Sequence, residues 1–230
     1  MTTKPTVFIT GANRGIGLEL VRQYAAAAWR VIATCRNPVG LGELARLHGE
    51  IEVHGLDVTD DNQATALAKE LDGTAIDVLI NNAGVYGPNK YSLDEVDEDA
   101  WTQTLRVNVM APLRISNLFT PHVAASTQRK IITVTSKMGS IADNASGGVY
   151  IYRSSKSAVN AVMRSLSHEL RDQGIIVTLL HPGWVKTDMG GPNALISVEQ
   201  SVTGVRGVIA NLSGEQSGSF LNYDGTEIPW

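Results

Sequence analysis

Tyr152 and Lys156 are a phenol and an ammonium group four residues apart, a spacing that could support proton transfer. Apolar residues follow them at helical spacing, namely Val159, Val162, Met163, Leu166 and Leu170. The two side chains are therefore expected to share one face of a helix. A free phenol has a pKa of about 10, and a neighbouring cation lowers that pKa by favouring the phenolate. The pair predicts a general acid, Tyr152, that gives a proton to a carbonyl oxygen and accepts it back in the oxidative direction.

Two other tyrosines compete for this role. Tyr86 also has a lysine four residues later, Lys90, but Pro88 lies between them and breaks a helix. Tyr150 has Ser154 at the same distance, which brings no charge. Tyr152 is therefore the preferred proton donor.

Ser136 follows the predicted strand Ile131–Thr135, where a hydroxyl could polarise the substrate carbonyl. Ser140 is the second candidate for this role. Asn108 lies among apolar residues in a predicted helix, although asparagine is a poor helix former. It either holds a water that passes protons to Lys156 or fills a polar gap with a hydrogen bond.

A glycine-rich turn connects the first predicted strand to a helix. It comprises Gly11, Ala12, Asn13, Arg14, Gly15, Ile16 and Gly17, directly after the strand Thr6–Thr10. Gly11 and Gly15 would let the backbone turn tightly and approach a pyrophosphate, and Gly17 would let the helix pack closely on the strand. Because a strand precedes these glycines and a helix follows them, the segment is predicted to be a dinucleotide-binding turn.

The second predicted strand indicates which dinucleotide binds. An NAD site usually has a carboxylate near this strand's end, but Ala33–Asn37 contains none. The planar, charged guanidinium of Arg36 could bind a 2′-phosphate, and Arg14 could reach the same phosphate. NADP(H) is therefore the expected cofactor. The alternative is that both arginines are only surface charges. Asp57, with Val58 beside it, could accept a hydrogen bond from the adenine amino group, or cap the next helix.

Seven short apolar runs alternate with helical stretches along the chain. The predicted strands are Thr6–Thr10, Val31–Thr34, Ile51–Leu56, Val78–Asn81, Ile131–Thr135, Ile175–Leu180 and Ser219–Leu221. This alternation predicts an α/β fold, a Rossmann-type doubly wound parallel sheet with helices on both faces. Residues 1–230 are expected to form a single domain that binds the cofactor and performs catalysis. Ligands of such folds bind beyond the carboxyl ends of the strands.

Composition narrows the possible partners. The 230 residues have a net charge of -4 with both signs mixed, which disfavours nucleic acid and anionic lipid as partners. The five histidines show no metal-ligand spacing, and no apolar run is long enough to span a membrane. Cys35 is the one cysteine, and the first strand begins too early to leave room for a signal peptide. We therefore expect a cytoplasmic protein with a small-molecule substrate and no metal.

Together these residues resemble the short-chain dehydrogenase/reductase family over essentially the whole chain. The matching positions occur in the family's order: Thr10, Gly11, Gly15, Gly17, Asn81, Asn82, Ala83, Gly84, Asn108, Ser136, Tyr152, Lys156, Pro182, Gly183 and Thr187. The resemblance implies that Asn82–Gly84 line the cofactor and that Lys156 also holds the nicotinamide ribose. Further implied cofactor contacts are Pro182, Gly183, Val185 and Thr187, on the carboxamide side.

The resemblance also implies a catalytic tetrad and an assembly. The tetrad is Asn108, Ser136, Tyr152 and Lys156, and the assembly is a homodimer or homotetramer built on long helices. Residues 146–156 and 223–230 resemble those of the C-factor and sniffer-like carbonyl reductases. The implied activity is NADPH-dependent reduction of aldehydes and ketones. The alternatives are alcohol oxidation with NADP+ and an NADP(H)-binding signalling protein.

Two departures from the family pattern stand out. Ala142–Gly148 lengthens the separation of Ser136 and Tyr152. Only about ten residues separate Thr187 from the helical stretch near Val198, where many relatives have a substrate lid. A short connection there predicts an open, permissive substrate site.

Overall fold

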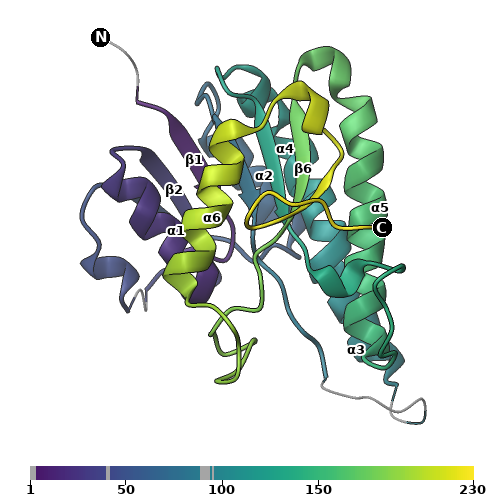
Figure 1. The fold of residues 1–230 in the computed structure, drawn as a ribbon. Coiled ribbons are helices and arrows are strands. Elements are labelled where there is room, and N and C mark those ends of the chain that lie inside the picture. The colour runs from purple at the N-terminus through teal and green to yellow at the C-terminus, as the bar shows by residue number, and fades with distance from the viewer. Residues whose placement is uncertain (1–3, 40–41, 89–93, 95) are drawn as a thin grey trace.

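A seven-stranded parallel sheet forms the centre of the protein (Figure 1). The computed structural model describes residues 4–39, 42–88, 94 and 96–230. The strands are β1 Thr6–Ile9, β2 Arg30–Cys35, β3 Glu50–Gly55, β4 Val78–Asn81, β5 Lys130–Val134, β6 Ile176–His181 and β7 Phe220–Asn222. Their order is β3-β2-β1-β4-β5-β6-β7, which confirms the predicted doubly wound sheet.

The order of the strands reverses direction at the β1–β4 pair. Val7 of β1 is paired with Val31 of β2 on one side and with Val78 of β4 on the other. The connection after β1 therefore crosses one face of the sheet, and the later connections extend the sheet in the opposite direction. In doubly wound sheets the crevice beyond this switch point is where ligands bind.

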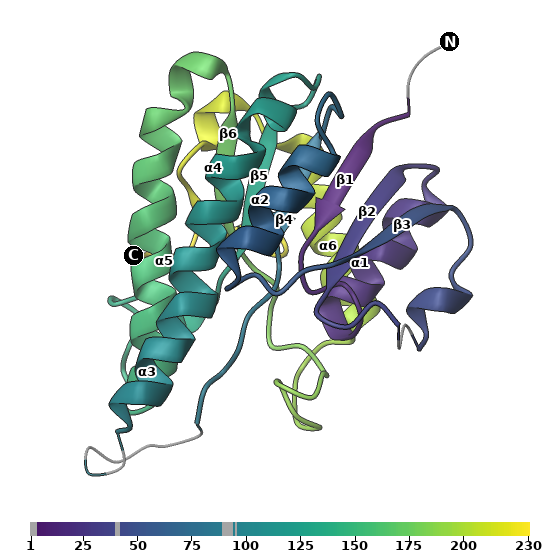
Figure 2. The ribbon, with the colours of Figure 1, turned by 180° about the vertical axis from the view of Figure 1, so that it is seen from behind.

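Helices cover both faces of the sheet. One layer contains α1 Gly15–Ala26 and α6 Val198–Asn211, and it lies in front of the sheet in Figure 1. The other contains α2 Asp61–Glu70, α4 Ala111–Ala124 and α5 Tyr150–Glu169, and it lies in front in Figure 2. Helix α3, Glu98–Leu105, continues into α4 through the π-helical turn Arg106–Met110.

Apolar side chains of the strands fill the space between the sheet and each helix layer. On the α2–α4–α5 side the rings of Phe8 and Phe119 are both fully buried, with centroids 4.5 Å apart. On the other side Leu20 and Tyr24 of α1 pack with Val205 of α6. Strands buried on both faces alternate between these two clusters, which is why they are apolar at successive positions.

The helices differ in how they begin. Side-chain oxygens of Asp60, Asp97 and Ser197 accept backbone N–H hydrogen bonds at the starts of α2, α3 and α6. Helix α1 begins after Arg14 with no side-chain cap. Its first turn therefore has N–H groups that a bound anion could satisfy.

No helix among the described residues is both long enough and apolar enough to cross a membrane. Over the same residues, no three side chains of the histidine, cysteine, aspartate or glutamate type gather into a possible metal site. Cys35 is a buried free thiol at the end of β2.

Candidate active site

The glycine turn after β1 has the shape that the sequence predicts. Gly11 and Gly15 have φ angles of +66° and +53°, in the left-handed region that favours glycine. A Cβ at Gly17 would overlap the carbonyl oxygen of Gly11 and lie 2.6 Å from the amide nitrogen of Asn82. The turn thus depends on glycine for its conformation and for its close approach to the segment after β4.

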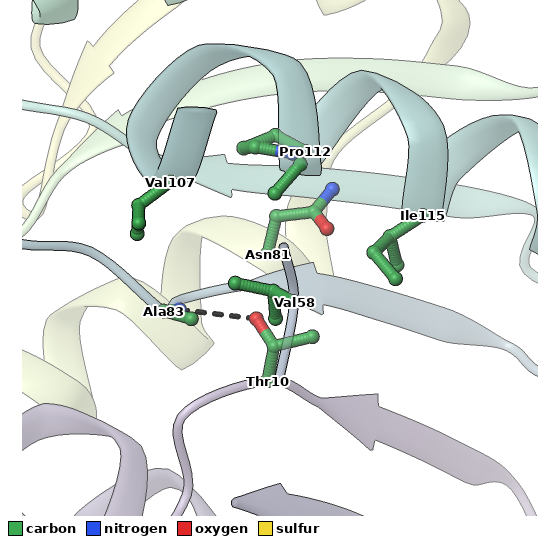
Figure 3. Close-up of a pocket in the computed structure, with 8 residues that line it drawn as sticks. Thr10, Val58, Asn81, Ala83, Val107, Pro112 and Ile115 are labelled. Atoms are coloured by element: carbon green, nitrogen blue, oxygen red, sulfur yellow. Dashed lines mark hydrogen bonds between the residues drawn. The ribbon is translucent and has the colours of Figure 1, made fainter. Parts of the chain in front are cut away.

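Hydrogen bonds between the ends of β1 and β4 hold this turn in place. The Thr10 hydroxyl accepts hydrogen bonds from the backbone N–H groups of Asn82 and Ala83, both at 3.0 Å; Figure 3 shows the bond to Ala83. The Asn82 side chain donates to the carbonyl oxygens of Thr10 and Gly11, at 2.9 and 3.1 Å. Asn82 therefore positions the glycine turn from the neighbouring strand.

The turn and the start of α1 fit a dinucleotide pyrophosphate. Ala83 leaves no room for a Cβ at Gly11, and the uncapped end of α1 lies directly beyond the turn. The exposed side chains of Asn13 and Arg14 lie between Gly11 and Gly15. Backbone N–H groups at a helix start attract a phosphate through hydrogen bonds and the helix dipole.

A group of apolar side chains lies beside the turn, under the segments that follow β3 and β4. Figure 3 shows Asn81 and Val58 near the centre of the group, with Ala83 and Val107 on one side and Ile115 on the other. The space among them is too small to admit a water molecule. They therefore form a packed apolar floor rather than a pocket of their own.

Asp57 and Arg36 lie close enough to interact at this end of the site. The positive charge of Arg36 contributes to a lowered pKa of Asp57, although hydrogen bonds from the Thr59 hydroxyl and N–H contribute more. Asp57 does not cap α2, because Asp60 does. Of the two predicted roles for Asp57, helix capping is wrong, and adenine binding stays a prediction.

Arg14 points away from this end of the site. Its guanidinium lies 3.3 Å from a carboxylate oxygen of Asp188, in the segment after β6, and both side chains are largely exposed. An exposed pair of this kind contributes little to stability. Arg14 would have to release Asp188 to meet a 2′-phosphate, whereas the exposed Arg36 has no such ion pair among the described residues.

Tyr152 and Lys156 lie on one face of α5, at the carboxyl end of the sheet. The Lys156 ammonium is 5.7 Å from the centre of the Tyr152 ring and donates a hydrogen bond to the Val134 carbonyl oxygen at 3.1 Å. Ser136, two residues beyond Val134, lies close enough to the Tyr152 hydroxyl to influence its pKa. The structure therefore brings together the serine, tyrosine and lysine that the sequence selected.

Burial sets the protonation of these groups. It raises the pKa of Tyr152 to about 12; the hydrogen bond with Ser136 opposes this rise, and the nearby Tyr86 adds to it. Burial also lowers the pKa of Lys156 to about 8. The expectation that Lys156 lowers the pKa of Tyr152 is not met by the protein groups alone, because desolvation of the phenolate dominates and Lys156 is not among the groups that shift this pKa.

Asn108 is hydrogen-bonded to the segment after β4. Its side-chain amide donates to the Val85 carbonyl oxygen and to the Ser155 hydroxyl, at 2.8 and 3.0 Å, and its oxygen accepts from the Val85 N–H at 2.9 Å. Both amide hydrogens are thus used within the protein. These hydrogen bonds show that Asn108 fills a polar gap. Its proposed role of holding a water stays a prediction. Asn108 lies in the π-helical turn, not in a regular α-helix.

The competing residues occupy other positions. The Ser140 hydroxyl donates to the Trp230 carbonyl oxygen at 3.2 Å, which anchors the end of the chain. Tyr150 is on the outside of α5 and is 43% exposed. The Tyr86 ring stacks on Tyr152, with centroids 4.5 Å apart and planes at 24°. Its predicted partner in sequence, Lys90, lies outside the described residues.

The segment after β6 closes against the glycine turn. Pro182 accepts a hydrogen bond from Ser201, and Gly183 has a φ angle of +87° with Ile196 against it. The buried Val185 is bridged to Ile196, which folds the segment back on itself. The methyl group of Thr187 would lie 3.5 Å from a Cβ at Gly15. The predicted contacts on the carboxamide side are thus adjacent to the turn.

His181 is a residue of this region that the sequence analysis missed. It ends β6 beside Asn222, and its Nδ1 atom is buried with no hydrogen-bond partner. Burial and the charges of Lys137 and Lys156 lower the pKa of His181 to about 4. The imidazole is therefore neutral at physiological pH. Its position directly before Pro182 was the one available signal.

A doubly wound sheet with a glycine turn at its switch point, and a serine, a tyrosine and a lysine gathered beyond the carboxyl ends of its strands, defines a dinucleotide-binding oxidoreductase. Residues 5–195 match the short chain dehydrogenase family model. The chain belongs to this family, which confirms the resemblance found in the sequence.

Solved structures and curated relatives extend this likeness. The NADPH-bound carbonyl reductase from chicken fatty liver is 36% identical, with full coverage of both chains and a TM-score of 0.91. The carbonyl reductase Sniffer of D. melanogaster is 33% identical over 99% of this chain and 100% of its own, with a TM-score of 0.92. The C-signal of Myxococcus xanthus is 47% identical over 67% of this chain and 93% of its own.

Proposed function

We propose that the protein is an NADPH-dependent carbonyl reductase that converts aldehydes and ketones to alcohols. The observation that carries the proposal is the placement of Ser136 beside Tyr152, with Lys156 one helical turn away on the same face of α5. The NADPH-bound chicken reductase, 36% identical over the whole chain, supports the choice of cofactor. One domain would hold both cofactor and substrate.

Each residue of the site would have its own role in the reduction. NADPH supplies the hydride when it is bound. Tyr152, a neutral phenol with a raised pKa, donates its proton to the carbonyl oxygen, which Ser136 polarises with a hydrogen bond. Lys156 is mostly protonated at neutral pH, since its pKa is about 8, and its charge stabilises the phenolate that forms.

Cofactor binding would use the rest of the predicted set. Gly11–Gly17 and the start of α1 hold the pyrophosphate, and Arg36 pairs with the 2′-phosphate. Lys156 has three N–H donors and uses one of them on Val134, so the others can hold the nicotinamide ribose. Asp57 accepts from the adenine amino group, and the carboxamide meets the segment from Pro182 to Thr187.

We propose an open site for apolar substrates. Trp184 and Leu195, in the segment after β6, are 50% and 77% exposed, and Val85 after β4 is 37% exposed. Both segments lie at the carboxyl edge of the sheet, as does the start of α5, which contains Tyr152 (Figures 1 and 2). Exposed apolar side chains at the edge of a site favour uncharged carbonyl compounds with apolar substituents.

A screen of NADPH oxidation tests this proposal. The panel would contain aldehydes, ketones, diketones and quinones, with charged keto acids as the matched comparison. We expect turnover of several apolar carbonyl compounds and a higher kcat/KM for them than for keto acids. Absence of turnover on the whole panel, or tighter binding of NADH than of NADPH in a titration, contradicts the proposal.

Two alternatives have specific support. The same residues could catalyse the reverse reaction, NADP+-dependent alcohol oxidation, since Tyr152 can take back the proton that it donates. A signalling role is favoured by the 47% identity with the C-signal of Myxococcus xanthus. The variant Tyr152→Phe separates these classes, because a protein that signals through NADP(H) binding alone should keep its biological activity without turnover.

We further propose a homodimer or homotetramer in the cytoplasm. The assembly would use the long helices α4 and α5, where Met110 before α4 and Leu113 within it are 54% and 39% exposed. The buried thiol of Cys35 is compatible with a reducing compartment. Light scattering should give two or four times the chain mass of 24.6 kDa. A mass equal to one chain rejects the assembly, and export of a tagged protein rejects the location.

A further inference from the structure

The ring of Tyr86 lies against the ring of the proposed proton donor. The two centroids are 4.5 Å apart and the planes are nearly parallel, at 24°. A tyrosine side chain can swing about χ1 and rotate about χ2 unless neighbours prevent it. A second aromatic ring stacked on one face restricts both motions, and therefore restricts where the Tyr152 hydroxyl can point.

The backbone around Tyr86 is itself fixed from both sides. On one side, Asn108 holds Val85 through two hydrogen bonds, to its N–H and to its carbonyl oxygen. On the other, Gly87 has a φ angle of +75°, and a Cβ there would lie 2.8 Å from the Thr104 hydroxyl. The Tyr86 ring is thus presented by a segment with little freedom to move.

The same asparagine connects this segment to α5. Its amide donates to the hydroxyl of Ser155, which in turn donates to the carbonyl oxygen of Tyr152 at 2.8 Å. The buried Asn108 side chain therefore holds both tyrosines in place, since it is hydrogen-bonded to Val85 beside Tyr86 and to Ser155, which is bonded to Tyr152. A contact made only by apolar packing would not need such a shared polar anchor.

We propose that Tyr86 is a positioning residue for the reduction, which stacks on Tyr152 and holds its hydroxyl toward Ser136, and that Asn108 acts through this stack. The inference rests on the proposed function of Tyr152 as proton donor. It assigns Asn108 a role that needs no bound water.

Three variants test the proposal: Tyr86→Ala, Tyr86→Phe and, as the matched control, Tyr150→Ala. Tyr150 is another tyrosine near Tyr152 in the sequence, but it is 43% exposed and lies outside the catalytic group. Tyr86→Ala should lower kcat by about 10-fold to 100-fold, the loss expected from a misplaced reacting group, and leave the Kd for NADPH within about two-fold. Tyr86→Phe keeps the stack and should restore kcat to within about three-fold of wild type.

A second readout does not depend on turnover. Nuclear magnetic resonance of 13C-labelled tyrosine, assigned with Tyr152→Phe, reports the ring-current shift and ring-flip rate of Tyr152. Both should change in Tyr86→Ala and stay near wild type in Tyr86→Phe and Tyr150→Ala. Wild-type kcat in Tyr86→Ala, or equal losses in the alanine and phenylalanine variants, overturns the proposal. If wild type reduces no carbonyl compound, the proposed function fails, while an unchanged Tyr152 spectrum in Tyr86→Ala independently rejects the stack.

Discussion

Burial acts in opposite directions on the pKa values of Tyr152 and Lys156, because it disfavours the charged form of each. For the phenol the charged form is the deprotonated one, so its pKa rises to about 12. For the ammonium the charged form is the protonated one, so its pKa falls to about 8. Within the pH range where enzymes work, Lys156 is therefore the group of this pair that titrates.

A pH dependence of the reduction follows from the pKa of Lys156. The rate constant kcat/KM should be level at lower pH and should decrease as the pH rises through about 8, where the ammonium loses its proton and no longer stabilises the phenolate. Initial rates over the range of about pH 6 to about pH 10, with NADPH affinity measured at each pH, provide the test. A level profile across this range shows that the charge of Lys156 is not needed.

The variant Arg36→Asp should change the cofactor preference. It removes the guanidinium that we propose pairs with the 2′-phosphate and places a negative charge there, so the Kd for NADPH should rise by about 10-fold or more. The Kd for NADH, which lacks that phosphate, should change little. Fluorescence titration of both cofactors gives the two constants.

Arg171→Asp is the control for this change. Arg171 is an exposed arginine in the turn before β6, at the opposite edge of the sheet from the glycine turn. The same charge reversal there should leave both cofactor affinities unchanged. An equal loss in the two variants would make the effect one of net charge, and no loss in Arg36→Asp would make Arg36 a surface charge.

Some of these residue roles could be predicted from the sequence, and some could not. Spacing selects Tyr152 with Lys156 once Pro88 excludes the equally spaced Tyr86 and Lys90, because an uninterrupted helix brings such a pair onto one face. The contact of Tyr86 with Tyr152 joins residues 66 positions apart and has no local signal. The direction of the Tyr152 pKa shift depends on burial, which only the fold determines, and so does the unpaired Nδ1 of His181.

Among the helices, the first turn of α1 leaves the least room for a side chain, at Gly17. The variant Gly17→Ala should lower the free energy of unfolding by about 1–3 kcal/mol, because a Cβ there overlaps the Gly11 carbonyl oxygen and cannot be accommodated without moving the turn. NADPH affinity should fall with it. Urea denaturation and a cofactor titration measure the two effects.

Gly207→Ala is the matched control, since Gly207 is also a helical glycine. It lies on the exposed side of α6, and no atom is within 4 Å of a Cβ built there. This substitution should raise stability by about 0.5–1 kcal/mol through better helix propensity. Similar destabilisation in both variants would mean that helix α1 does not need glycine for close approach.

The elements themselves follow the sequence pattern closely. All seven predicted strands are confirmed, each within one residue at either end, because their apolar runs are bounded by polar turns. The π-helical turn at Arg106–Met110 was not predicted, since the hydrophobic pattern of α3 continues into α4 without a break. The capping role considered for Asp57 was wrong because Asp60, three residues on, is the residue that caps α2.

At the scale of the whole molecule, the end of the chain returns to the site. The Trp230 carbonyl oxygen accepts hydrogen bonds from the backbone N–H groups of Ile141 and Ala142, at 2.8 and 2.9 Å. The Trp230 ring packs on Phe220 of β7. The segment after Ser136 is thereby tied to the last strand of the sheet. The sequence showed that these last residues resemble those of carbonyl reductases, but not what they contact.

We propose that Tyr152 donates a proton during an NADPH-dependent reduction. The most direct measurement compares kcat and NADPH affinity of the wild type, Tyr152→Phe and the control Tyr150→Phe on the best substrate of the screen. We expect Tyr152→Phe to lose at least about 100-fold in kcat, the usual contribution of a general acid, with NADPH binding unchanged and the control unaffected. Turnover by Tyr152→Phe at the wild-type rate would contradict it.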